Sequence, residues 1–213
     1  MAAERCIEGH GDLVKSPLAL PQEFFDRDPR RVARDLLGKL LVRRIGRQTL
    51  SARIVETEAY LGKNDPAAHS ASGRTPRNAV IFGPPGFAYV YFIYGNHYCL
   101  NVSCLPDGEP GGVLFRAVEP VTGLTWMARN RALPQVPAHH LTNGPGKLTQ
   151  ALSITRADNG TNLTDPTQSL YLGSDNLPKP LVQTTPRIGI SKAVARKLRY
   201  VVAGNPFVSR RSF

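Results

Sequence analysis

Two glutamates, Glu56 and Glu58, are the residues of this chain best suited to acid or base chemistry. They stand in the segment RIVETEAYLG, which begins at Arg53. On a β-strand, residues two apart share a face about 6 to 7 Å from each other, and crowded carboxylates raise the pKa of one member. Tyr60 joins this face, where its ring could hold a flat base while a carboxylate directs a water molecule. Two glutamates on a solvated strand face are the commoner explanation, so the spacing alone leaves both open.

A tyrosine-rich segment, YVYFIYGNHYCLN, occupies positions 89–101. Its two apolar halves flank Gly95 and Asn96, which is typical of a tight β-hairpin whose glycine takes a positive φ. This turn places Tyr94 and His97 at the hairpin tip. Because an aromatic ring beside a tight turn is poorly covered by protein, we interpret Tyr94 as an exposed wedge aimed at a partner.

Other aromatic residues near this segment have different simplest explanations. Tyr89 and Tyr98 are expected to be strand aromatics that pack across a sheet. His69 follows two alanines in the motif AAHS, within a stretch at 61–86 that is rich in Gly, Pro, Asn and Ser. A long irregular connection of this kind usually persists when it builds a site. The histidines and cysteines show no metal-binding spacing, so no metal site is predicted.

The charge balance indicates a polyanionic partner, because 27 Lys and Arg residues outnumber 16 Asp and Glu residues and give a net charge of +11. A length of 213 residues with 41% hydrophobic content suits one well-packed domain. The three cysteines form no CxxC pair and are expected to remain reduced thiols. The sequence lacks a long apolar run, so neither a signal peptide nor a transmembrane span is predicted.

Two basic clusters and one lysine are candidates for phosphate contacts. The clusters, at 30–34 and 192–199, also fit solvated helix faces, which is their simplest explanation. Lys147 follows the glycine-containing turn at 144–146, where a helix is predicted to begin. Leucines occupy two of the defining positions of a nucleotide P-loop, so that motif is absent, but Lys147 could still hold a backbone phosphate.

Signals for helices and strands alternate along the chain. Asp28 followed by Pro29 predicts a capped helix that ends before Gly38. Further helices are predicted to open at Pro120 and at Pro145. The predicted strands are at 40–42, 50–60, 89–94, 97–103, 113–118 and 199–203, the later helices at 120–132 and 145–152, and a turn-rich stretch at 156–186.

Several motifs together resemble those of the alkyladenine (3-methyladenine) DNA glycosylase family, monofunctional methylpurine-DNA glycosylases of base excision repair that carry a tyrosine wedge. The motifs are IVETEAYLG, AAHS, TPRN, YVYFIYG, LNVS, VLFRAVEP, NGPGKLTQALSI and LRYVVAGNPFVS. The resemblance implies an α+β fold, in which residues 20–213 form a single domain with a mostly antiparallel curved β-sheet, flanking helices and a protruding DNA-inserting β-hairpin. Residues 1–19 would form a short N-terminal extension.

The resemblance also implies how a reaction would run. Glu58 would act as the general base that polarises a water molecule toward the sugar carbon of a flipped nucleotide. Arg116 would help to hold that water, and the backbone carbonyl of Ile188 would be its third partner. Direct hydrolysis would leave an abasic site and would need neither a cofactor nor a lysine nucleophile.

The same resemblance implies a pocket for a flipped purine. Tyr60, His69 and Tyr91 would line it, while the amide of Asn101 would collide with the exocyclic amino group of normal guanine. Tyr94 would enter the minor groove and fill the gap that the flipped nucleotide leaves. The implied substrates are 3-methyladenine, 7-methylguanine, ethenoadenine and hypoxanthine.

The hairpin tip departs from the family pattern, because Asn96 stands where an apolar residue such as Met is more common. Asn96 and His97 at this polar tip are candidates for contacts to the DNA backbone. Lys147, at the turn before the predicted helix, is a third candidate. We expect a monomer whose partner is double-stranded DNA containing damaged purines, without membrane association. It would act in the cytoplasm and nucleoid of a bacterium, or in the nucleus of a eukaryote.

Two alternatives of other classes remain open on the sequence. The first is a noncatalytic nucleic-acid-binding module that uses the basic surface and the aromatic residues. The second is a metal-dependent nuclease in which Glu56, Glu58 and Asp65 gather a divalent ion and cut the phosphodiester backbone.

Overall fold

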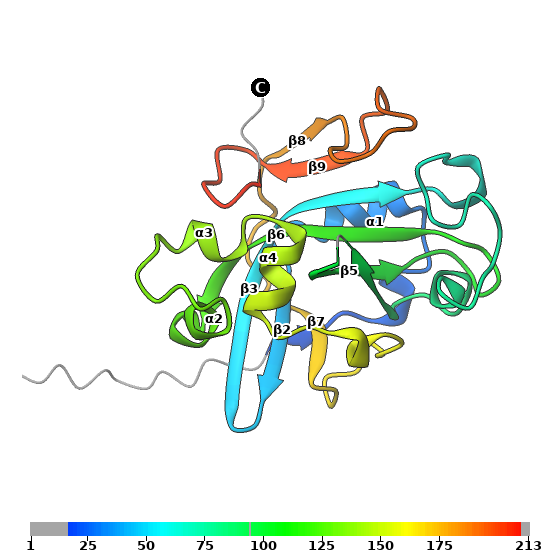
Figure 1. Ribbon diagram of the computed structural model, residues 1–213. Helices are drawn as coiled ribbons and strands as arrows, with labels where there is room; N and C mark the ends of the chain where they lie inside the picture. The colour runs from blue at the N-terminus through cyan, green and yellow to red at the C-terminus, as the bar shows by residue number, and fades with distance from the viewer. Residues whose placement is uncertain (1–16, 94, 210–213) are drawn as a thin grey trace, which may run out of the picture.

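The computed structural model describes residues 17–93 and 95–209 (Figure 1). Within them, nine strands form one antiparallel sheet, in the order β1-β7-β2-β3-β6-β5-β4, while β9 pairs with β3 and β8 pairs with β9. The strands are β1 (Leu18–Ala19), β2 (Leu40–Ile45), β3 (Gln48–Tyr60), β4 (Ala88–Ile93), β5 (His97–Ser103), β6 (Gly112–Thr122), β7 (Leu170–Ser174), β8 (Val182–Thr185) and β9 (Arg199–Val202). The α-helices are α1 (Pro29–Asp35), α2 (Leu124–Asn130), α3 (His139–Thr142) and α4 (Pro145–Ala151), and short 3₁₀ helices cover Gln22–Phe24, Gly62–Asn64, Ala79–Phe82 and Arg156–Asp158.

The central strand β3 gives the sheet its curl. One of its edges pairs with β6 along most of its length. The other edge pairs first with β2, at 48–53, and then with β9, at 56–58. The register with β6 shifts on both sides of Glu56, and such irregularities bend a strand and increase its twist. The curled sheet with its flanking helices confirms the predicted α+β class. Glu56 and Glu58 lie on the part of β3 that pairs with β9 instead of β2.

Helices cover the sheet through buried apolar side chains. Helix α1 begins as predicted, because the Asp28 carboxylate accepts a hydrogen bond from the main-chain N–H of Arg30 at 2.8 Å. Its Val32 and Ala33 are buried in the main core. Helix α4, also close to its predicted bounds, buries Leu148 and packs against β5 and β6. No helix among the described residues is long and apolar enough to span a lipid bilayer.

One predicted helix begins too early. The stretch from Pro120 was expected to be helical, but β6 continues to Thr122 and α2 starts only after Gly123, whose φ is +80°. Pairing with β3 explains the difference, since Pro120 lies opposite Ala52 and the Thr122 side chain accepts the main-chain N–H of Ser51 at 3.0 Å. Sheet hydrogen bonds therefore outweigh the local preference of proline for a first helical turn.

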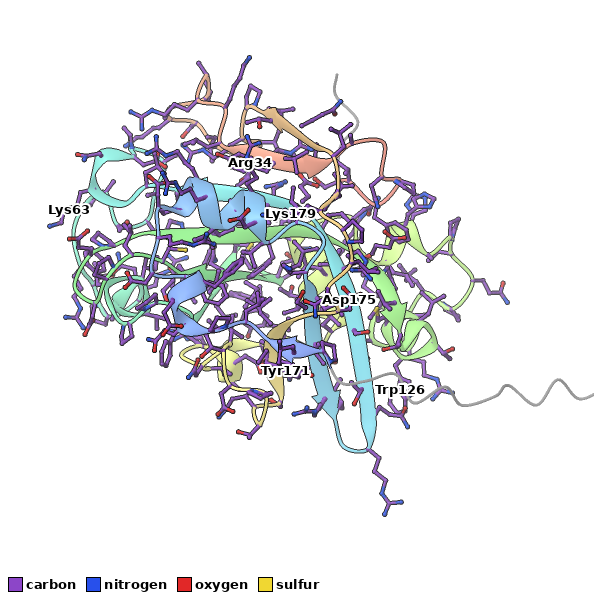
Figure 2. All side chains as sticks on the ribbon, turned by 180° about the vertical axis from the view of Figure 1, so that it is seen from behind. Arg34, Lys63, Trp126, Tyr171, Asp175 and Lys179 are labelled. Carbon is purple, nitrogen blue, oxygen red and sulfur yellow. The ribbon has the colours of Figure 1, made fainter. Side chains whose placement is uncertain are left out.

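Other predicted bounds were too short. Strands β2 and β3 extend through most of the expected link at 43–49, and the turn-rich stretch contains β7 and β8. The first strand of the sheet, β1, begins at Leu18. Seen from behind in Figure 2, β7 carries Tyr171, and Asp175 just beyond it pairs with Arg53 at 2.7 Å.

The predicted hairpin is formed by β4 and β5, which pair from Ala88 and Val102 to Ile93 and His97. Gly95 has a φ of +73°, as the turn prediction requires. Tyr94 lies outside the described residues, so its position as a wedge, and the insertion of the hairpin into DNA, stay predictions.

Candidate active site

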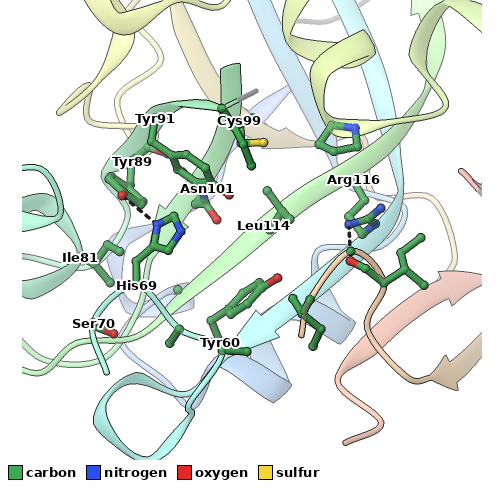
Figure 3. A pocket seen from close by; sticks show the side chains of 18 of the residues that line it. Tyr60, His69, Ser70, Ile81, Tyr89, Tyr91, Cys99, Asn101, Leu114 and Arg116 are labelled. Atoms are coloured by element: carbon green, nitrogen blue, oxygen red, sulfur yellow. Dashed lines mark hydrogen bonds between the residues drawn. The ribbon is translucent and has the colours of Figure 1, made fainter. Parts of the chain in front are cut away.

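A cavity of about 1200 Å³ opens beside the hairpin. Its walls come from segments far apart in the sequence: the loop at 66–72, strands β4 and β5, the start of α4 and the segment 188–192. Figure 3 shows aromatic and polar side chains directed into this space. The irregular stretch at 61–86 therefore does build a wall of a pocket.

Glu58 lies behind this cavity and is fully buried. Its Oε1 accepts the main-chain N–H of Ile188 at 2.9 Å, and its Oε2 accepts the hydroxyl of Tyr60 at 3.0 Å. Nη1 of Arg116 lies 3.3 Å from Oε2. These three partners all line the cavity. The explanation of a solvated strand face is therefore wrong for Glu58.

The environment of Glu58 suits a proton acceptor. Burial raises the pKa of its carboxyl group, and the charge of Glu56 adds to that effect. The charge of Arg116 and the hydrogen bonds from Ile188 and Tyr60 act in the opposite direction. The net result is a pKa above the ordinary glutamate value, the direction expected of a general base that works near neutral pH.

Arg116 links Glu58 to the main chain of Ile188. Its Nη1 donates to the carbonyl oxygen of Ile188 at 3.4 Å, and its Nε donates to Glu56 at 3.0 Å. The guanidinium of Arg116, on the cavity wall, thus contacts both the buried Glu58 carboxylate and the Ile188 carbonyl. Such a set can hold one water molecule, because it offers both hydrogen-bond donors and acceptors.

Glu56 is also fully buried, and its carboxylate is saturated with donors. Oε1 accepts Nε of Arg116 and, at 2.7 Å, Nε of Arg199, while Oε2 accepts the main-chain N–H of Ser209 at 2.6 Å. Arg199, expected on a solvated face, is instead buried in this cluster. Glu56 therefore balances charge and positions Arg116, and it is not available as a base.

The carboxylates required by the nuclease alternative already have cationic partners. Glu56 and Glu58 share Arg116, and Asp65 pairs with the buried Arg187. Across residues 17–93 and 95–209, no group of three or more His, Cys, Asp or Glu side chains is arranged to hold a metal ion. The charges of all three carboxylates are thus compensated by guanidinium groups.

The aromatic part of the cavity brings together Tyr60, His69 and Tyr91. The rings of His69 and Tyr91 meet edge to face, with centroids 4.5 Å apart. Burial and the nearby charge of Arg77 lower the pKa of His69, so its imidazole is neutral at pH 7. The three predicted pocket residues therefore do form one lining.

Asn101 and Tyr89 complete this lining (Figure 3). The amide of Asn101 donates to the carbonyl oxygen of Tyr89 at 3.2 Å, which fixes its orientation. The Tyr89 hydroxyl lies 3.1 Å from Nδ1 of His69. Tyr89 was expected only to pack across the sheet, but it supports two lining side chains. Its two-residue spacing from Tyr91 was the signal that could have placed it on the pocket face.

Two of the three predicted DNA-contact residues, His97 and Lys147, line the cavity. His97 packs so closely on Gly146 that a Cβ atom there would lie 2.8 Å from its ring, which explains why a glycine occupies this position. Lys147 lines the cavity and donates to Asn143 at 2.7 Å. Asn96 is exposed. His97 and Lys147 thus share the cavity lining, and Asn96 precedes His97 at the hairpin turn.

Comparison with known proteins adds independent findings. Residues 23–206 match the family model for methylpurine-DNA glycosylase. A protein of Koribacter versatilis is 57% identical over 195 residues, covering 91% of this chain and 94% of its own. Relatives from Methanoculleus marisnigri and Methanocella arvoryzae are 50% and 46% identical over 197 residues, with 91% of this chain and 100% and 96% of theirs covered. Each of the three carries a name that proposes 3-methyladenine DNA glycosylase activity.

Proposed function

The chain belongs to the methylpurine-DNA glycosylase family, and from this premise we propose that it flips damaged purines out of double-stranded DNA and hydrolyses their N-glycosidic bonds. It is thereby a DNA glycosylase of DNA repair, a hydrolase of N-glycosyl bonds. The proposed substrates are 3-methyladenine, 7-methylguanine, ethenoadenine and hypoxanthine. The meeting of Glu58, Arg116 and the Ile188 carbonyl beside a tyrosine-lined cavity is the observation that carries the proposal.

In the proposed reaction, a water molecule sits between Glu58, Arg116 and the Ile188 carbonyl. The bond between the sugar C1′ and the base nitrogen breaks, and its electron pair leaves with the base. The water oxygen bonds to C1′ and gives a proton to the ionised Glu58 carboxylate. A cationic base thereby leaves as the neutral base, whereas a neutral base such as hypoxanthine takes up a proton from solvent as it leaves, and the DNA product is an abasic site. Water is the nucleophile in this scheme and no lysine forms a Schiff base with the sugar, so the strand is not expected to be cut.

The pocket supports selection in two steps. Flipping a base costs a few kcal/mol, and a damaged or mismatched base costs less, so extrusion already favours lesions. Inside the pocket, the faces of Tyr60 and Tyr91 attract the cationic ring of an alkylated purine. The fixed amide of Asn101 would collide with the exocyclic amino group of normal guanine.

DNA binding relies on the basic surface and the hairpin tip. Tyr94 would fill the gap in the minor groove, and aromatic stacking returns roughly 1 to 3 kcal/mol per base. Asn96, His97 and Lys147 would contact the backbone beside it. We further propose that one monomer suffices, acting in the nucleoid of a bacterium or the nucleus of a eukaryote.

The test uses end-labelled duplex DNA with one ethenoadenine or one hypoxanthine, incubated in EDTA with the wild type or Glu58→Gln and then heated in alkali. We expect cleavage only after alkali, and its loss in the variant. Glu109→Gln is the matched control, because Glu109 is exposed and outside the cavity lining. If no damaged purine is released, the binding-module alternative replaces the proposal. Metal-dependent cutting without alkali would support the nuclease.

A further inference from the structure

The Tyr60 ring has a cation behind it. The guanidinium carbon of Arg187 lies 4.6 Å from the centroid of the ring. Tyr60 lines the cavity, whereas Arg187 does not and its side chain is fully buried. The guanidinium therefore approaches the ring from the protein side, and a base in the cavity would meet the same ring from the open side.

Asp65 neutralises this cation. Its Oδ2 and Oδ1 accept Nη1 and Nη2 of Arg187 at 2.5 and 2.8 Å, and both side chains are fully buried. Nη1 also donates to the Ala59 carbonyl at 3.0 Å, so the guanidinium cannot turn away. Although burial opposes its ionisation, the hydrogen bonds from Arg187 and from the Leu61 N–H lower the pKa of Asp65. The pair is thus ionised at neutral pH and carries no net charge.

The balance of this pair matters for a charged base. A ring face attracts a cation through its quadrupole. A second cation on the opposite face repels the first through the ring, unless an anion compensates. A base stacked on Tyr60 would lie roughly 8 Å from the guanidinium, a distance at which unit charges still interact strongly in a partly buried site. A neutral base would not experience this repulsion.

We propose that Asp65 sets the preference between cationic and neutral lesions, by neutralising Arg187 so that Tyr60 can accept a cationic base. Asp65 is then a positioning residue that acts through Arg187 and Tyr60 without touching the substrate. The inference deepens the proposed function and rests on it, since it requires the damaged base to bind against Tyr60.

The test compares two lesions in the same enzyme preparation. The specificity constant for release of 7-methylguanine, a cationic base, is divided by that for hypoxanthine, a neutral one. In Asp65→Asn this ratio should fall by on the order of tenfold, because an uncompensated guanidinium remains behind Tyr60. In Arg187→Gln, which removes the guanidinium itself, the ratio should not fall. The double variant, with an uncharged pair, should return near the wild-type ratio.

The ratio of the two specificity constants separates an effect of charge on base preference from an effect of misfolding. A loss of folded enzyme lowers both specificity constants equally and cancels in the ratio. Asp175→Asn is the matched control, because it breaks an aspartate–arginine pair outside the cavity lining, with Arg53 (Figure 2). An unchanged ratio in Asp65→Asn, or a shift of the same sign in both single variants, would overturn the inference. Failure of the wild type to release either base would instead overturn the proposed function.

Discussion

Ile188 holds Glu58 through the main chain: its N–H donates to Oε1 of the carboxylate at 2.9 Å, across 130 positions of sequence. The carbonyl of the same residue accepts Arg116. A main-chain donor is not removed by substituting the side chain at 188. The orientation of the carboxylate is therefore set by the path of the chain, whichever apolar side chain stands there.

Base release should slow as the pH falls through the pKa of Glu58. Burial places that pKa above 4.5, the ordinary value, and only the ionised carboxylate can accept a proton from water. Single-turnover rates on DNA containing 7-methylguanine isolate this acidic limb of the pH–rate profile, because that base needs no further protonation before it leaves. The residual rate of Glu58→Gln should show no such limb. A limb that persists in the variant would assign the titration to another group.

Removal of the Tyr60 hydroxyl should move this acidic limb to higher pH. The hydroxyl donates to Oε2 of Glu58 at 3.0 Å and lowers the pKa of that carboxyl group. Tyr60→Phe keeps the ring and removes only the donor. The pH dependence of the single-turnover rate checks the direction of the shift. Tyr98→Phe, whose ring packs on Phe92 outside the cavity lining, should leave the limb in place.

Substitution of Glu56 should cost stability as well as activity. Glu56→Gln leaves the buried guanidinium of Arg116 short of one carboxylate, and breaking such a pair typically costs about 3 to 5 kcal/mol. Urea denaturation measures this loss, and the fraction that folds should release bases more slowly because Arg116 is less well held. Glu109→Gln, at an exposed position, should stay within about 0.5 kcal/mol of the wild type. Equal stability of the two variants would contradict the charge-balancing role of Glu56.

Lys147 should contribute one phosphate contact. Log affinity for DNA should fall linearly with log salt, and Lys147→Gln should lower the slope by about 0.9. Binding is best measured with Glu58→Gln as the background, so that the lesion is not consumed. Lys179→Gln is the control, because Lys179 is exposed, pairs with Asp35 and stands outside the cavity lining (Figure 2). A slope unchanged by the loss of Lys147 would remove it from the interface.

Local features of the fold were predictable from the sequence. The cap at Asp28 and the positive φ of Gly95 depend on neighbouring residues, and both are found. The β3 segment was recognisable from its own composition. The helix start at Pro120 was not, because pairing with a strand far away in sequence decided it. Secondary-structure propensity is a property of one segment, whereas strand formation also depends on the neighbouring strand with which that segment pairs.

The site also combines features that the sequence predicted with features that depend on distant segments. Family motifs gathered Glu58, Tyr60, His69 and Tyr91, and the structure places these residues around one cavity. They did not reveal Arg187 behind Tyr60 or the saturation of Glu56 by Arg199. Arg199 was expected on a solvated face and Arg187 was assigned no role, since a charged side chain gives no local sign that it will be buried. Only the meeting of distant segments supplies the carboxylates that permit burial.

The cluster around Glu56 can be completed only late in the synthesis of the chain. On the ribosome, Glu56 is made long before Arg199 and Ser209, which follow it by 143 and 153 positions. At ordinary rates of synthesis that interval is roughly 7 to 30 s. Until then, the carboxylate lacks two of the partners that permit its burial, and β3 lacks β9 along one edge. A nascent chain that stops before Arg199 thus lacks part of its catalytic centre. We expect base release only from chains that have been translated through Arg199 and Ser209.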